Sequence, residues 1–196
     1  ALGFRSRDRT PAETLQISRK PEGLARAIAG MSVCIETNSP DKSYPSMREH
    51  PPELELVDER TQDSQHELTH LNDIIFEVPQ RYEELFVISP LAYYLKADVQ
   101  LTDRKSVVCS ISDRDFKYEF AQQPTLEKES NRMLRRVFLL DCLVRDFGHY
   151  QTNLVERDLL QQIGIHGTRC YDLSPEVRLI EYINAPFEQI QSELPE

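Results

Sequence analysis

The string His66-Glu-Leu-Thr-His70 carries the best-defined chemistry that this sequence could perform. Residues four apart on a helix share one face, so the two imidazoles could bind Zn²⁺ while Glu67 activates the bound water. Such a site needs a third protein ligand, and helices of this kind normally carry uncharged or apolar residues where this chain has Asp63 and Asn72. We therefore favour a solvated polar segment without a metal, and keep a zinc-dependent metallopeptidase or hydrolase using His66, Glu67 and His70 as the alternative.

Nucleophilic catalysis by a thiolate beside an imidazole would draw on Cys170 and on His149 or His166. An imidazole followed by Gly, as at His166, is similar to caspase-like enzymes, but their nucleophile follows tens of residues later. Only Cys170 follows His166 here, so we favour a loop histidine and a buried cysteine. The four cysteines of the chain include no C-x-x-C pair, which favours buried free thiols over a disulfide frame or a thiolate metal site.

Asp141, Arg145 and His149 follow one another at four-residue intervals along the predicted long helix of residues 125–147, through its most apolar turns. Charged side chains are tolerated in a protein interior when they are paired. The spacing therefore predicts an ion pair between Asp141 and Arg145 that fixes the helix in its packed position. The alternative is that the three side chains form a polar site that lines a binding pocket.

The pattern of secondary-structure elements that would position the candidate residues is clearest at residues 85–101. The continuous apolar run 85–88 is typical of a buried strand, Ser89 of an N-cap and Pro90 of a first helical residue, and 98–101 of a second strand. This order predicts a compact βαβ unit and a parallel sheet. Ser89 would lie where open α/β sheets often bind ligands, but no glycine-rich loop accompanies it, so we assign it to capping.

The remaining elements follow from apolar periodicity and from Pro and Gly positions. Further strands are predicted at residues 14–18, 54–57, 74–78, 107–111 and 116–120, the last two as a hairpin. Helices are predicted at 21–35, 125–147, 156–163, 175–183 and 187–194, and the Pro-rich residues 38–52 as an extended connection. The expected fold is α/β, with a small mostly parallel sheet, covering helices and a helical C-terminal third.

The composition describes a rather polar globular protein, 196 residues long with 39% hydrophobic and 29% charged residues. We expect one domain over residues 13–196, sheet-rich at 13–122 and helical at 123–196, after a disordered leader or cloning remnant at 1–12. No apolar run approaches a membrane span and no secretion signal is recognisable, so we expect a cytoplasmic protein. The formal net charge of −10 repels phosphate backbones, so nucleic acid is not an expected partner.

Four stretches resemble a family of uncharacterised haloarchaeal proteins, and the likeness covers most of residues 14–195. They are SPDKSYPSMREHPP at 39–52, LFVISPLAYYLKA at 85–97, RVFLLDCLVRDFGHY at 136–150 and YDLSP at 171–175. Longer members of that family carry a CHAT-like, caspase-related domain after this region. The resemblance implies that the chain is an α/β region upstream of a peptidase-like domain, and it assigns no catalytic residue to these positions.

The sequence thus predicts a non-catalytic regulatory or recognition domain of a larger cytoplasmic protein, without a cofactor. The expected partners are other domains of the full-length protein or a separate protein, and neither nucleic acid nor a membrane. The oligomeric state is left open. The rival hypothesis remains a zinc hydrolase acting through residues 66–70.

Overall fold

The computed structural model describes residues 14–58, 73–149, 151–152, 154–186 and 188. The strands are β1 (Thr14–Ile17), β2 (Glu53–Leu56), β3 (Ile74–Pro79), β4 (Asp98–Thr102), β5 (Val108–Ile111) and β6 (Lys117–Glu119). The α-helices are α1 (Pro21–Met31), α2 (Tyr82–Leu95), α3 (Thr125–Arg145), α4 (Asp158–Gln162), α5 (Gly167–Tyr171) and α6 (Pro175–Asn184). Short 3₁₀ turns are η1 (Ser32–Cys34), η2 (Pro40–Ser43), η3 (Pro45–Met47) and η5 (Val155–Arg157).

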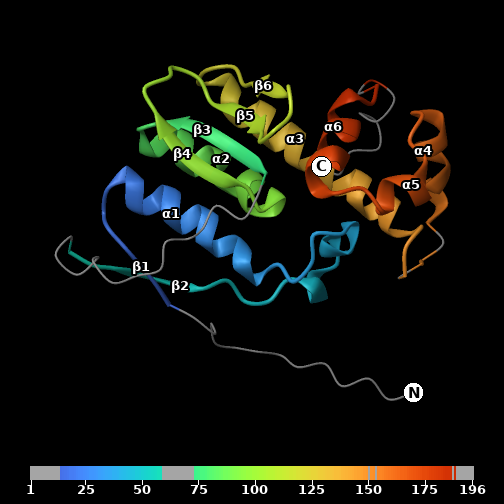
Figure 1. The fold of residues 1–196 in the computed structure, drawn as a ribbon, viewed down its shortest axis with the longest axis horizontal. Coiled ribbons are helices and arrows are strands. Elements are labelled where there is room, and N and C mark those ends of the chain that lie inside the picture. The colour runs from blue at the N-terminus through green and yellow to red at the C-terminus, as the bar shows by residue number, and fades with distance from the viewer. Residues whose placement is uncertain (1–13, 59–72, 150, 153, 187, 189–196) are drawn as a thin grey trace, which may run out of the picture.

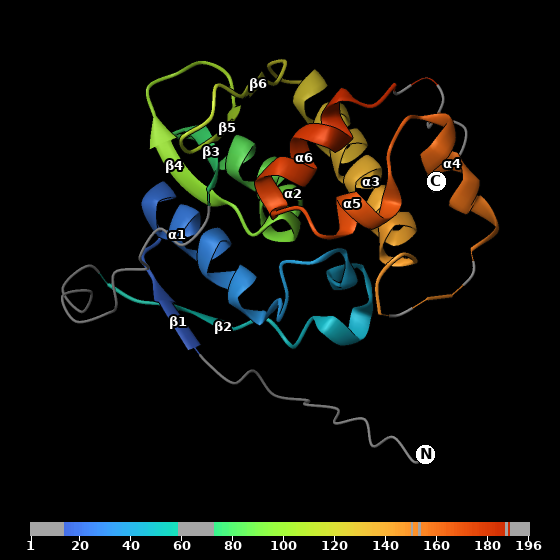
Figure 2. The same ribbon diagram turned by 45° about the vertical axis from the view of Figure 1, so that its right-hand side comes forward.

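These elements confirm the α/β class and the helical C-terminal region. The central sheet is mixed and has the strand order β4-β3-β5-β6. β3 pairs in parallel with β4 and antiparallel with β5, and β5 pairs antiparallel with β6 as the predicted hairpin requires. A separate two-stranded ladder joins β1 and β2 in parallel. Helix α1 lies between this ladder and the central sheet (Figures 1 and 2).

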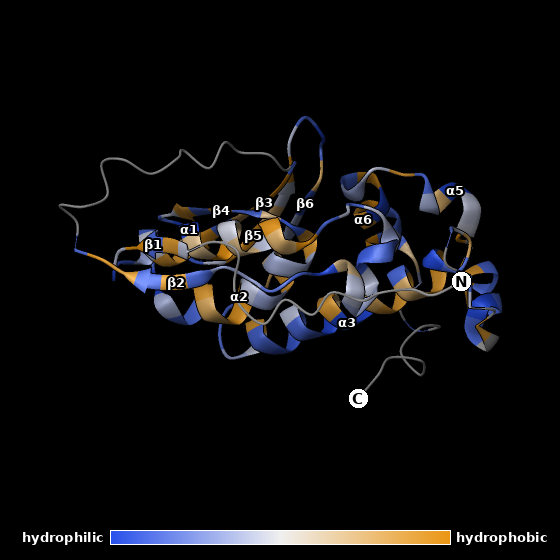
Figure 3. Cartoon of the chain, turned by 90° about the horizontal axis from the view of Figure 1, so that it is seen from below, coloured by the Kyte–Doolittle hydropathy of each residue, from blue (hydrophilic) through white to orange (hydrophobic). Residues whose placement is uncertain are grey.

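One apolar core joins the central sheet to the helices from α1 to α6. Phe76 and Val78 of β3 and Cys109 of β5 are fully buried, because alternate strand residues point to the same face. Helix α3 places Met133, Val137 and other apolar residues at helical spacing on its buried side. In Figure 3, α1 and α3 each carry hydrophobic and hydrophilic residues around their circumference, as helices with one buried side do.

The structure corrects the predicted strand at residues 85–88, which belongs to the middle of α2. Leu85, Ile88 and Leu91 are buried at helical spacing, and Glu83 stands in the first turn, where a carboxylate stabilises the helix dipole. The βαβ unit exists, but its first strand is β3, and α2 connects it to the parallel strand β4. An apolar run of this length fits a buried strand and a buried helix equally well, which explains the error.

Ser89 is correspondingly not an N-cap, and Pro90 lies inside α2. A proline has no N–H, so Pro90 cannot donate to the carbonyl of Phe86, four residues earlier. The hydroxyl of Ser89 donates a hydrogen bond of 2.9 Å to that same carbonyl oxygen. The Ser-Pro pair therefore satisfies the acceptor locally, which lets the helix continue through the proline to Leu95.

The Pro-rich connection at residues 38–52 is more ordered than its composition predicts. It forms η2 and η3, and Pro40, Asp41, Lys42 and Ser43 of η2 are all buried. The hydroxyl of Ser39 accepts a hydrogen bond from the Asp41 N–H and caps the turn. The packing of η2 against α3 brings charged side chains into the interior, where they need partners.

Three sequence predictions fall outside the part of the chain that the structure describes, namely the leader at residues 1–12, the polar segment with the zinc candidates at residues 66–70, and most of the helix at 187–194. Within the described part, no helix is both long enough and apolar enough to cross a bilayer.

Candidate functional site

Asp141, in the last turns of α3, is the centre of a buried polar cluster. Tyr94 of α2 and Tyr182 of α6 donate hydrogen bonds to its two carboxylate oxygens at 2.9 and 3.0 Å. Lys42 Nζ lies 3.9 Å and Arg178 Nε 3.4 Å from the same carboxylate. All five side chains are buried, so the carboxylate is paired in a region where an isolated charge would be costly.

This cluster corrects the ion pair predicted between Asp141 and Arg145. Arg145 instead donates a hydrogen bond of 2.6 Å from Nη1 to Ser43 Oγ, and its guanidinium lies 3.6 Å from the centre of the Tyr44 ring. Asp141 takes its cations from η2 and α6, which pack against α3 from distant parts of the sequence. Spacing along one helix contains no information about partners that other elements supply.

His149 belongs to neither group of contacts, because α3 ends at Arg145 and His149 lies beyond it on the surface. Its imidazole meets the Tyr171 ring edge to face, with 6.1 Å between ring centres. Asp141, Arg145 and His149 therefore contact different neighbours, and the structure does not bring them together around one pocket.

The partners of the Asp141 cluster give it a structural role. Besides its ion pair, Arg178 donates hydrogen bonds to the carbonyl oxygens of Leu173 at 2.8 Å and of Asn38 at 2.5 Å. The tyrosine hydroxyls and both cations hold η2, α2 and α6 against α3. Because these polar groups are engaged with one another in the interior, the cluster is suited to fixing the fold rather than to binding a ligand.

Burial lowers the pKa of Lys42 from 10.5 to about 8, although Asp141 raises it and Arg178 lowers it further. Burial also raises the pKa values of Tyr94 and Tyr182 well above their ordinary value, and the nearby Asp141 carboxylate acts in the same direction on both. The cluster is therefore held with both tyrosines neutral, and Lys42 is the group in it that changes charge in mildly alkaline solution.

This lowered pKa predicts that Lys42 makes the protein more stable as the pH rises from 7 to 9. Between pH 8 and 10.5 the unfolded chain binds more protons at this lysine than the folded chain, so the free energy of unfolding increases with pH. The increase attributable to Lys42 between pH 7 and pH 9 is about 1 kcal/mol. Urea unfolding of the wild type and of Lys42→Met at pH 7, 8 and 9, under reducing conditions, measures it as the difference between the two proteins.

The comparison with Lys42→Met removes contributions that both proteins share. Burial raises the pKa of Cys109 to about 12 and that of Cys170 to about 11, so these thiols oppose the lysine above pH 9 in either protein. Parallel pH curves for wild type and variant would contradict the assignment to Lys42.

The cysteine-protease arrangement is not formed by His166 and Cys170. The Cys170 thiol is buried, and burial raises its pKa to about 11, which is the opposite of what a nucleophilic thiolate needs. His166 is exposed, and its Nδ1 accepts a hydrogen bond of 3.4 Å from the Arg169 N–H at the start of α5. The loop histidine acts as a helix cap, and the thiol contributes to the core.

The zinc candidates His66, Glu67 and His70 lie in residues 59–72, outside the described residues. The described residues contain no group of three His, Cys, Asp or Glu side chains placed to hold a metal ion. The zinc-hydrolase alternative therefore stays a prediction from the sequence.

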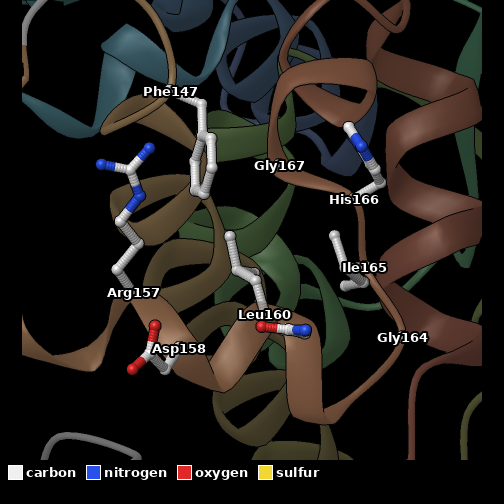
Figure 4. Close-up of a pocket in the computed structure, with 9 residues that line it drawn as sticks. Phe147, Arg157, Asp158, Leu160, Gly164, Ile165, His166 and Gly167 are labelled. Carbon is white, nitrogen blue, oxygen red and sulfur yellow. The ribbon is translucent and has the colours of Figure 1, made fainter.

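A cavity of about 510 Å³ opens between the segment that follows α3, helix α4 and the start of α5. Its lining residues are Phe147, Arg157, Asp158, Leu160, Gln161, Gly164, Ile165, His166 and Gly167. Figure 4 shows Phe147 and Arg157 side by side on one wall and His166 on the opposite wall. Neither Phe147 nor Arg157 was a candidate in the sequence, because nothing in their spacing links them to His166.

Backbone geometry explains the shape of this cavity. Gly164 has a φ of 77°, and after α4 the N–H groups of Gly164 and Ile165 bond to the carbonyls of Gln161 and Leu160 at 3.1 and 2.8 Å. This is the Schellman pattern of a helix end, which glycine favours. At Gly167 a side-chain Cβ would lie only 2.4 Å from the Phe147 ring, so a glycine is needed for α5 to pack there. Gly164 thus reverses the chain after α4, and Gly167 lets it pack closely against Phe147.

Arg157 is held in position by two neighbours. Its guanidinium lies 4.0 Å from the centre of the Phe147 ring, and Nη1 lies 3.6 Å from Oδ2 of the fully buried Asp146. The Arg157 side chain is 38% exposed, so it is open to solvent as well as fixed. A guanidinium oriented in this way over an aromatic ring suits the recognition of a carboxylate beside an apolar group.

Comparisons of this chain with models of protein families, with curated proteins and with solved structures found no match. The resemblance to the haloarchaeal family, and the CHAT-like domain that it implies, accordingly stay predictions from the sequence.

Proposed function

We propose that this chain is a non-catalytic recognition domain that binds a carboxylate-bearing segment of a protein partner in the cavity between α3, α4 and α5. The observation that carries the proposal is the Arg157 guanidinium, fixed over Phe147 at the wall of a cavity of about 510 Å³. The partner is another domain of a longer protein or a separate protein, as the sequence predicts.

The size and lining of the cavity support this choice of ligand. Pockets of about 300–1,000 Å³ take small ligands or side chains, and they combine apolar walls with a few polar groups. Phe147, Leu160 and Ile165 supply apolar surface here, while Arg157 and His166 supply polar groups on opposite sides. A C-terminal residue with an apolar side chain has the matching chemistry, since it presents a carboxylate next to a hydrophobic group.

The state of the buried polar side chains and thiols supports the non-catalytic part of the proposal. The Asp141 carboxylate and the cations that pair with it are engaged with one another inside the protein. Burial raises the pKa values of Cys109, Cys142 and Cys170, so these thiols are not activated as nucleophiles. The cavity offers recognition groups, and it lacks a pairing of nucleophile and base among its lining residues.

Titration with N-acetylphenylalanine, followed by ¹⁵N-HSQC spectra, tests the proposal. We expect saturable shifts of the Gly164 and Gly167 amide signals, which report on the cavity. Arg157→Gln is expected to weaken binding at least about tenfold, because a charge-assisted hydrogen bond is lost. Asp158→Asn is expected to strengthen it about two- to fivefold, because this substitution removes a carboxylate from the cavity lining.

Two controls make the test specific. N-acetylphenylalaninamide lacks the carboxylate and is expected to bind at least about tenfold more weakly. Arg26→Gln removes an exposed arginine from α1, away from the cavity, and is expected to leave binding unchanged. Equal binding of acid and amide, or no shift at Gly164 and Gly167, would refute the carboxylate site. Stoichiometric zinc in the purified protein that is lost in His66→Ala would favour the hydrolase alternative instead.

A further inference from the structure

Strand β2 has an open outer edge in the part of the chain that the structure describes. Among the described residues its ladder contains β1 and β2 alone, and all four residues of β2 are exposed. Leu54 and Leu56 are 39% and 55% exposed, although both are apolar residues in a strand. Ladders of two strands are marginal by themselves, and open edges readily accept another strand.

The backbone of β2 is oriented to accept such a strand. The Val57 N–H donates a hydrogen bond of 2.9 Å to the carbonyl of Ile17, so Val57 faces β1. Backbone groups of successive strand residues point to opposite sides, so those of Glu53 and Glu55 also face β1. The N–H and C=O groups of Leu54 and Leu56 therefore point to the open edge.

The two faces of the ladder have different chemistry. The register places Leu54 and Leu56 beside Leu15 and Ile17, so these four apolar residues share one face. Ile17 is buried, whereas the β2 half of that face remains exposed. The other face carries Glu53 and Glu55, beside Thr14 and Gln16 of β1. Gln16 donates a hydrogen bond of 3.0 Å to Glu55, and both glutamates are exposed.

We infer that the β2 edge is a docking site for an extended partner segment in which basic and apolar residues alternate. The segment adds a third strand, bonded to the outward backbone groups of Leu54 and Leu56. Its basic side chains lie beside Glu53 and Glu55, and its apolar side chains cover the two leucines on the other face. This surface is independent of the cavity at Arg157.

The charge of β2 decides between a basic partner and a second copy of the chain. Two β2 strands paired edge to edge would place the glutamates of one copy beside those of the other, and like charges at neighbouring positions are destabilising. A net charge of −10 adds to this repulsion and attracts a basic segment.

Fluorescence anisotropy with two labelled peptides tests the inference. The first peptide is Thr-Lys-Val-Lys-Val-Lys-Thr, and the second replaces each Lys by Glu. We expect saturable binding of the basic peptide and at least about tenfold weaker binding of the acidic one. In the double variant Glu53→Lys/Glu55→Lys, this preference is expected to reverse.

A proline substitution separates strand addition from simple charge attraction. Leu56→Pro removes an N–H that points to the open edge and leaves the donors to β1 in place, so basic-peptide binding is expected to fall about tenfold. Leu56→Val keeps the N–H and an apolar side chain, and is expected to change binding less than about twofold. Cavity variants such as Arg157→Gln are expected to bind the basic peptide normally, which separates this site from the carboxylate site.

Four results would overturn the inference. The first is equal binding of both peptides, and the second is no reversal in the charge-swapped protein. The third is concentration-dependent self-association that Leu56→Pro abolishes, because it would make a second copy the occupant. Unchanged peptide affinity in Leu56→Pro would likewise rule out an added strand. The charge-swapped variant keeps the test decisive if the proline variant does not fold.

Discussion

Replacing Asp141 by Ala is expected to lower the free energy of unfolding by about 3–5 kcal/mol, because it leaves buried cations without their counter-ion. Lys42 and Arg178 both pair with this carboxylate, and Tyr94 and Tyr182 donate hydrogen bonds to it. Lys42 can lose its proton in response, whereas an arginine stays charged at any ordinary pH. Urea unfolding at pH 7 measures the loss, and a lower melting temperature accompanies it.

Glu127→Ala is the matched control for this experiment. It removes a carboxylate from the same helix, but in the exposed first turn, where the contribution is less than about 1 kcal/mol. An Asp141→Ala protein as stable as the Glu127→Ala protein would contradict the central role of Asp141 in the buried cluster.

Leu85→Ala is expected to cost about 2–5 kcal/mol of stability, while Phe86→Ala next to it costs less than about 1 kcal/mol. Leu85 is fully buried on the core side of α2, whereas Phe86 is 61% exposed and stacks on Tyr82, with 6.4 Å between ring centres. Removal of the buried side chain leaves a cavity, and removal of the exposed one does not. Chemical denaturation of the two variants measures the difference.

The same pair of variants distinguishes the helix from the strand that the apolar run suggests. In a strand covered on both faces, neighbouring residues are both buried, so both substitutions would be costly. Similar losses of stability in Leu85→Ala and Phe86→Ala would therefore contradict a helix at these residues and favour the strand predicted from the sequence. Phe86→Leu, which keeps an apolar side chain at the exposed position, is expected to behave like the wild type.

The sequence predicted many of the elements correctly where local rules govern them. Pro21 begins α1, the strands β2 to β5 lie within a residue or two of their predicted positions, and α3 follows its apolar periodicity. The α5 helix was missed because its five residues carry no usable periodicity. The α2 error has another cause, since a short run of apolar residues has no period that separates helix from strand.

The candidate sites were less predictable than the elements. Asp141 and Arg145 were singled out correctly as polar residues within apolar turns, and both are buried. Their partners were not predictable, because Lys42, Ser43 and Arg178 reach α3 from distant parts of the chain. The cavity at Arg157 was missed for the same reason, since the segment after α3 and the start of α5 meet there only after folding.

The amino-acid sequence by itself determined the α/β class and most element positions, because helix and strand periods, prolines and caps act over a few neighbouring residues. Only the tertiary structure decided which cations pair with Asp141, that Arg157 packs on the Phe147 ring, and which edge of β2 is left open by the described residues. These outcomes depend on packing between segments far apart in the chain. Burial then makes each charge require a partner, whichever element supplies it.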